Sequence, residues 1–261
     1  MIAEVYGKIS HSGSNLSERL EDQLTGDFLG NLRYIPFEKG MKIILEKAKH
    51  IYGTTLLSDE MKRIVIQDIW NDKISFWPYD QQGELDAVLE VGNLVIGIEV
   101  KYESGLSSQD NVQDIEKTNN QLVREMRIIR NKALIDGKQA LLLFIARQEG
   151  AESICQQVYD MYFRSGQNME ASLYCISWEQ ILQELKSIVS SHELNAFEKL
   201  ILQDLIDLMT RKGFDRFKGF EVETICESKD VFFDFKKEAI PSINFNINKQ
   251  IEGTVYYGFE N

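Results

Sequence analysis

Residues Glu84 to Tyr102 read ELDAVLEVGNLVIGIEVKY, and this stretch decides the fold. Two short apolar runs flank Gly92-Asn93, and a Gly-Asn pair between such runs is typical of a two-residue hairpin turn. The turn predicts two antiparallel strands in which Val91 faces Leu94. Counting outward from the turn, one residue on each strand at a time, then places Asp86 opposite Glu99.

The predicted pairing brings two carboxylates and one lysine to the same face of the hairpin. Opposed residues have Cβ atoms about 5 Å apart, and Lys101 projects from the same face because it lies two residues beyond Glu99. Carboxylates this close repel each other or retain a proton. A hard divalent cation removes the repulsion, since carboxylate oxygens are its preferred ligands. The pattern therefore indicates a metal site suited to an anionic substrate, with an ammonium group that can position water or neutralise a phosphate.

The alternative for this stretch is an edge hairpin with solvated charges. The second strand argues against it, because Leu94 to Val100 is apolar at positions that would face both sides of a sheet. Charged side chains rarely lie unpaired in such a buried strand.

Asp86 followed by Glu99-Val100-Lys101 after a short hairpin resembles the PD-(D/E)xK nuclease superfamily, with Leu85 at the position of the family's proline. The resemblance implies an α/β fold with a restriction-endonuclease-like core, which is a mixed central β-sheet flanked by helices. It implies that Asp86 and Glu99 bind Mg²⁺, for which Mn²⁺ can substitute, and that the Val100 carbonyl completes the inner shell. Lys101 would position or activate the attacking water.

Two helices extend this resemblance. Apolar residues at helical spacing follow Asn15, and Asn15 with Glu18 has the spacing of a capping box. In the family a glutamate on the first helix reaches the metal or its waters, and Glu21 is the first choice for that role, with Glu18 second. Gln121, in the run QLVRE, resembles the glutamine that orients the catalytic lysine or a substrate phosphate. Gln121 lies on a helix expected from about Val112 to Asp136.

The same helix carries Arg124, Arg127 and Arg130, which either form a solvated face or line the cleft with positive charge. The polar run from Glu103 to Asn111 predicts a mobile loop at the mouth of the site. The aromatic cluster at residues 76–78 is interpreted as core rather than as a platform for stacking bases.

The rest of the chain alternates between helical and strand patterns, which favours an α/β fold. The expected helices are 41–50, 151–163, 178–190 and a long one that ends near 213 after a cap at Ser190 and Glu193, and the expected strands are 73–79, 139–147 and 172–176, with 59–70 ambiguous. Residues 1–213 are predicted to form the nuclease-like domain. Residues 214–261 are predicted to be a C-terminal extension of short strands with an oligomer or partner-protein contact.

Composition narrows the class of protein further. The chain has 261 residues, 43% of them apolar and 27% charged, and a net charge of −12, which argues against a surface that coats nucleic acid. A signal peptide, a membrane-spanning run, a P-loop and a Cys/His zinc pattern are not found in the sequence. Cys155, Cys175 and Cys226 are expected to be reduced thiols of a cytoplasmic protein. Three scattered histidines give little support to a histidine-based triad.

Two main hypotheses follow. The first is a Mg²⁺-dependent nuclease that hydrolyses phosphodiester bonds of nucleic acid, DNA rather than RNA, with a role in restriction, repair or phage defence implied by the resemblance. The second is a catalytically inactive scaffold of the same fold that binds nucleic acid or a protein. A weaker third reading is a metal phosphoesterase acting on small nucleotides.

Overall fold

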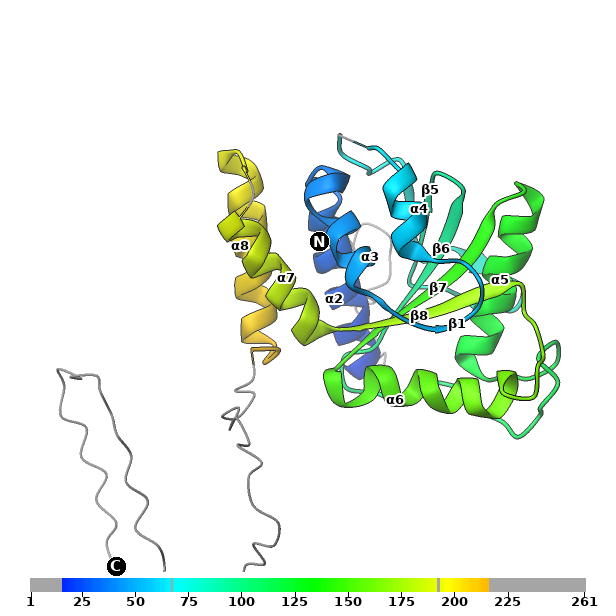
Figure 1. Ribbon diagram of the computed structural model, residues 1–261. Helices are drawn as coiled ribbons and strands as arrows, with labels where there is room; N and C mark the ends of the chain where they lie inside the picture. Colours follow the sequence, from blue (N-terminus) through cyan, green and yellow to red (C-terminus); the bar gives the residue numbers. More distant parts are fainter. Residues whose placement is uncertain (1–15, 67, 192, 216–261) are drawn as a thin grey trace, which may run out of the picture. The chain divides into compact units, whose positions relative to one another are not determined.

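A six-stranded mixed sheet organises the described part of the chain, which comprises residues 16–66, 68–191 and 193–215 (Figure 1). In this computed structural model the strands are β1 Lys49–Tyr52, β2 Ile74–Phe76, β3 Tyr79–Asp80, β4 Gly83–Glu84, β5 Ala87–Val91, β6 Leu94–Val100, β7 Gln139–Ala146 and β8 Ala171–Ser177. The order across the sheet is β1-β8-β7-β6-β5-β2, and β3 pairs with β4 as a separate ribbon. The three central strands β6, β7 and β8 are parallel, whereas β1, β5 and β2 are antiparallel to their neighbours.

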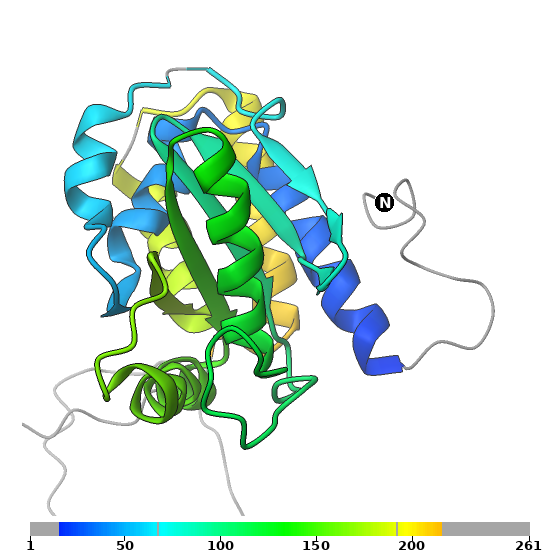
Figure 2. The ribbon, with the colours of Figure 1, turned by 90° about the vertical axis from the view of Figure 1, so that its right-hand side faces the viewer.

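Helices cover both faces of this sheet, as the two views in Figures 1 and 2 show. The helices are α2 Leu16–Leu32, η1 Phe37–Lys39, α3 Met41–Lys47, α4 Leu57–Arg63, α5 Gln121–Ile135, α6 Gln148–Val158, η2 Tyr159–Phe163, α7 Trp178–Ser191 and α8 Ala196–Arg211. One apolar core lies between the sheet and α2, α3, α4, α7 and α8. A second core lies between the other face and α5 with α6. The α/β class and the mixed sheet flanked by helices agree with the sequence prediction.

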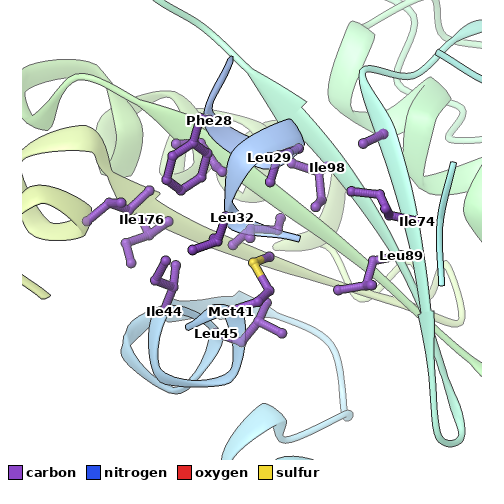
Figure 3. Close-up of a cluster of buried hydrophobic side chains, with 14 of the residues drawn as sticks. Phe28, Leu29, Leu32, Met41, Ile44, Leu45, Ile74, Leu89, Ile98 and Ile176 are labelled. Atoms are coloured by element: carbon purple, nitrogen blue, oxygen red, sulfur yellow. The ribbon is translucent and has the colours of Figure 1, made fainter. Parts of the chain in front are cut away.

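The first core is made of large side chains from the N-terminal helices packed on the middle of the sheet. Figure 3 shows Phe28, Leu29 and Leu32 of α2 with Met41 of α3, next to Ile98 of β6. All five are fully buried. At roughly 1.5–3 kcal/mol for each fully buried large side chain, this face supplies much of the free energy that holds α2 against the sheet.

The predicted hairpin is confirmed. Val91 pairs with Leu94 and Ala87 pairs with Ile98, so the register is the one that the turn dictates. Gly92 adopts φ +54°, the left-handed conformation that the first residue of a type I′ or II′ turn requires. All seven residues of β6 are buried, as expected for a strand covered on both faces.

Gly97 allows α5 to approach β6 more closely than any side chain would permit. A Cβ atom at this position would lie 2.5 Å from Cγ1 of Ile129. Eight residues of helix separate Ile129 from Gln121, about 12 Å, and four residues of strand separate Gly97 from Lys101, about 13 Å. The contact therefore sets the first turn of α5 against the carboxyl end of β6.

The helix predicted from Val112 is shorter than expected, because α5 begins at Gln121. Hydrogen bonds to Asp110 hold the residues before Gln121 in a loop instead of a helix. Its carboxylate accepts from the Thr118 hydroxyl at 2.5 Å and from the Asn119 N–H at 2.7 Å. Asn120 then caps α5 by accepting from the Val123 N–H. Local side-chain acceptors of this kind compete with helix formation, so residues 112–120 form a loop.

Three other expectations were wrong in detail. The predicted helix at 41–50 ends at Lys47, and β1 follows because its backbone pairs with β8. The predicted strand 73–79 is interrupted, because Ile74–Phe76 forms β2 and Tyr79 begins β3 of the separate ribbon. The segment 59–70, which the sequence left ambiguous, contains the end of α4. The last helix is capped by Asn195 and Glu198 in a reciprocal capping box rather than by Ser190 and Glu193.

Several expectations fall outside the described residues. These are the cap at Asn15, the side chain of Glu18, Cys226 and the strands expected within 216–261. Phe214, which the sequence placed at the start of the C-terminal extension, is buried against Trp178 with ring centroids 5.4 Å apart. In the described part of the chain no helix has both the length and the apolar character needed to cross a membrane.

Candidate functional site

The predicted site residues meet where β6 ends. Val88 of β5 and Val95 of β6 belong to the core under α5, so the alternating side chains of Asp86, Glu99 and Lys101 point to that same side of the sheet. Gln121 reaches them from the first turn of α5, and Glu21 reaches them from α2. All five side chains that the sequence selected are therefore brought together.

Asp86 lies just before β5 and closes the end of the hairpin. Its Oδ2 accepts a hydrogen bond of 2.7 Å from the backbone N–H of Val100. Burial raises the pKa of Asp86 well above its ordinary value, and the charge of Glu99 raises it further. The carbonyl of Val100 lies on the same edge of β6 as its N–H, because both groups of a strand residue point to the same neighbour.

Glu99 is only 3% exposed and is held from two sides. Its Oε1 accepts from Nε2 of Gln121 at 2.5 Å and lies 2.9 Å from Nζ of Lys101. Burial, together with the charge of Glu125, raises the pKa of Glu99 to about 8 despite the nearby ammonium. A carboxyl group at this position therefore keeps its proton more readily than one in water.

Lys101 is the cation at the centre of these acids. Its Nζ lies 2.9 Å from Glu99 and 3.4 Å from Oε2 of Glu21. Burial alone would lower the pKa of Lys101, but the two glutamates outweigh it and raise the pKa above the ordinary value. The backbone carbonyl of Lys101 accepts from the indole N–H of Trp178 at 2.9 Å, which fixes the end of the strand.

Both carboxylate oxygens of Glu21 accept hydrogen bonds. Besides Lys101, it accepts from the Tyr102 N–H at 3.1 Å and from the Ser104 hydroxyl at 2.5 Å, both through Oε1. In this arrangement Glu21 positions Lys101 and the chain that leaves β6.

Gln121 joins the site to the loop that precedes α5. Its Nε2 donates to Glu99, and its Oε1 accepts from the Ser107 N–H at 2.8 Å. The loop that precedes α5 spans 103–120 and includes the run from Glu103 to Asn111 that was predicted to be mobile. It is held at Ser107 and by the Asp110 hydrogen bonds described above.

Glu125 is a site residue that the sequence analysis missed. It is fully buried one turn after Gln121, and neither of its carboxylate oxygens has a hydrogen-bond partner among the described residues. Burial raises the pKa of Glu125 to about 8, and the charge of Asp86 adds to this rise. The Gln121 amide lies near enough to favour the ionised form and counteracts part of this rise, although its contact with Glu125 falls short of hydrogen-bond geometry. The spacing of four from Gln121 is the signal that placed Glu125 on the same side of the helix.

The three arginines of α5 do not fit either interpretation made from the sequence. Arg127 donates to the carbonyls of Ile115 and Thr118, and Arg130 pairs with Glu116, so both tie the 103–120 loop to the helix. Arg124 donates to the Ser108 hydroxyl of the same loop.

The chemistry of this group fits a hard divalent cation, because carboxylate oxygens are the ligands that such an ion prefers. In the described part of the chain, however, no three acidic, histidine or cysteine side chains are already arranged around one point to hold a metal. Glu99 and Glu21 instead share the Lys101 ammonium, as the distances above show. A bound cation would therefore be held by Asp86, Glu99 and the Val100 carbonyl after Glu99 turned from Lys101.

Comparison of the chain with protein-family models, with curated proteins and with solved structures finds no match.

Proposed function

We propose that the protein is a Mg²⁺-dependent nuclease that hydrolyses phosphodiester bonds of nucleic acid, with DNA as its substrate. The observation that carries the proposal is an excess of buried carboxylates around one lysine at the end of β6. Glu125 of α5 and Glu99 of β6 are buried beside the half-buried Asp86, and among the described residues Lys101 is the cation that pairs with Glu99 and Glu21. Buried charge is costly unless it is paired or binds a metal.

A solely structural role accounts poorly for this arrangement. Replacing a buried ionic group by apolar residues is often neutral or stabilising, so stability alone does not favour retaining several acids in one place. Perturbed pKa values cluster at functional sites, and here at least two carboxyl groups have their pKa raised to about 8. The surplus of acidic groups over cations supports a divalent cation, which displaces the protons of its carboxylate ligands when it binds, as the missing partner.

Each residue has a distinct part in the proposed reaction. A bound Mg²⁺ would polarise a phosphate oxygen and lower the pKa of its water. Asp86, Glu99 and the Val100 carbonyl would hold the ion, while Lys101 would orient the attacking water or neutralise the scissile phosphate. Glu21 and Gln121 hold Lys101 and Glu99 in place, through the bonds that they make in the structure.

The deciding experiment incubates purified protein with plasmid, linear duplex, single-stranded DNA and RNA in Mg²⁺, Mn²⁺ or EDTA. We expect cleavage that requires the metal and is lost in Asp86→Asn. Millimolar Mn²⁺ should also raise the melting temperature of the wild type, since a ligand that binds only the folded state stabilises it. Asp86→Asn should abolish that rise. Asp136→Asn, at the opposite end of α5, is the matched control and should behave as wild type.

A second candidate function is a scaffold that binds nucleic acid or a protein without cleaving it. The pairing of Lys101 with Glu99 and Glu21 favours this candidate, because the ammonium already compensates part of the charge. The net charge of −12 points the same way. Retention of a nucleic acid in a gel-shift assay, without cleavage in any metal, would support the scaffold and reject the nuclease.

A further inference from the structure

Six glutamates are buried in the described part of the chain, and five of them have a clear partner. Two are Glu21 and Glu99 of the site. Glu60 pairs with Arg63, Glu179 accepts from the Gln148 N–H, and Glu198 accepts from the Asn195 N–H and binds Lys39. Glu125 is the exception, because both of its oxygens are buried and neither makes a hydrogen bond to another described residue. In its ionised form a carboxylate of this kind costs stability unless a charge from outside the chain compensates it.

The position of Glu125 shows where that charge would lie. Ile129 covers Gly97, and Glu125 is four helical residues before Ile129, about 6 Å along α5. Glu99 is two strand residues after Gly97, about 6.6 Å along β6. Glu125 therefore lies over Glu99. The charge of Glu125 raises the pKa of Glu99, and the charge of Asp86 raises the pKa of Glu125, so the three acids are close enough to interact. Gln121, one turn earlier, already bonds Glu99 from the same side of the helix.

We infer that Glu125 is a third carboxylate ligand of the divalent cation held by Asp86 and Glu99. This inference rests on the proposed function for the identity of the site, and it adds a ligand from α5 to those of the hairpin. The two unpartnered oxygens of Glu125 then receive the cation, and the cation is enclosed between sheet and helix. The ligands are all oxygens, so the site takes Mg²⁺ or Mn²⁺.

The test measures binding rather than turnover. Mn²⁺ is titrated calorimetrically into the full chain and into Glu125→Gln, which keeps the shape of the side chain and removes its charge. We expect the variant to bind Mn²⁺ at least about 10-fold more weakly, a loss typical of disturbing a metal's surroundings. In metal-free buffer Glu125→Gln should melt no lower than wild type, because the change removes an uncompensated buried acid. Glu60→Gln, a buried glutamate on α4 with its own partner, is the control and should bind Mn²⁺ as wild type does.

Each other outcome decides against the inference. Unchanged Mn²⁺ affinity in Glu125→Gln would overturn it. If Glu125→Gln does not fold, Glu125→Met is read in its place, and failure of both to fold would show that Glu125 is needed for structure, not for metal. A wild type that binds no Mn²⁺ overturns both this inference and the proposed function. If Mn²⁺ binding depends on Glu125 but no nucleic acid is cleaved, the role of Glu125 as a metal ligand stands and only the proposed nuclease activity is rejected.

Discussion

Glu90 and Glu99 lie on the same hairpin, under opposite ends of the same helix, yet their surroundings are opposite. At the turn, Glu90 pairs with Lys138 at 2.9 Å and Lys132 at 3.0 Å, and hydrogen bonds from these lysines lower its pKa. At the other end, Glu99 shares one lysine with other acids, and burial raises its pKa to about 8. The C-terminal end of α5 and the residues after it place lysines beside Glu90. The N-terminal part of α5 places Gln121 and Glu125 beside Glu99.

The difference distinguishes a charged group with a structural role from charged groups with a functional role. Two lysines around one partly exposed glutamate leave no unmet negative charge, and pairs of this kind contribute about 0–1 kcal/mol. The end of β6 has the reverse ratio, with several buried acids for each cation. Natural proteins keep such imbalances at functional sites, where the cost is tolerated for the sake of binding or catalysis.

The largest contrast should come from removing one lysine at each end. Lys101→Met leaves Glu99 and Glu21 without their cation, and breaking a buried pair costs about 3–5 kcal/mol. Cleavage should fall about 100-fold or more, while Mn²⁺ binding is retained because lysine is not an oxygen ligand. Lys138→Met should cost no more than about 1 kcal/mol. Denaturant unfolding and nuclease assays measure both, and equal losses of stability would erase the contrast between the two ends.

An intermediate effect is expected from the glycine that sets α5 on the sheet. Gly97→Ala brings a Cβ atom against Ile129 and should cost about 1–3 kcal/mol through overpacking. It should also lower cleavage, up to about 100-fold, because a small shift of α5 misplaces Gln121 and Glu125. Gly150→Ala is the same change on α6, where the nearest atom is 3.5 Å from the new Cβ, and it should be nearly neutral. Full activity in Gly97→Ala would mean that the site does not depend on the helix.

The smallest effect is a difference in pH dependence between the two glutamates. The folded-state pKa of Glu99 is about 8, above its ordinary value of 4.5, so the folded protein holds more protons than the unfolded chain between these values. Stability should therefore fall as pH rises from about 4.5 to 8. Glu99→Gln should weaken that fall and raise the metal-free melting temperature at pH 8 by a few °C.

Glu90 should show the opposite sign. Its pKa is lowered, so its contribution is present above pH 4.5 and is lost as the pH falls through the folded-state pKa. Glu90→Gln should cost a few tenths of a kcal/mol at pH 7 and nothing at low pH. Thermal melts in EDTA between pH 4 and 8.5 give both profiles, and parallel profiles for the two variants would contradict the assignment.

The hairpin and the meeting of Asp86, Glu99 and Lys101 were predictable because a two-residue turn fixes the register of both strands. Glu125 was not, because a glutamate bordering the apolar stripe of a helix looks the same in sequence whether it faces water or the sheet. Its burial follows from Gly97, which is distant in the chain. The strand β1 was missed for the same reason: it exists because β8 offers it a partner.

Two backbone N–H groups at the end of β6 point away from β7. Each of them donates to a carboxylate of the site instead of to a neighbouring strand. The amide of Val100 donates to Asp86, and the amide of Tyr102 donates to Glu21. In a ¹⁵N-resolved NMR spectrum these two resonances are internal probes, each reporting on one acid. If a cation draws Asp86 away, the Val100 signal shifts and its hydrogen exchange accelerates, while the Tyr102 signal stays in place as long as Glu21 keeps holding the end of the strand. The order in which the two signals move during a titration with diamagnetic Mg²⁺ identifies the carboxylate that turns first.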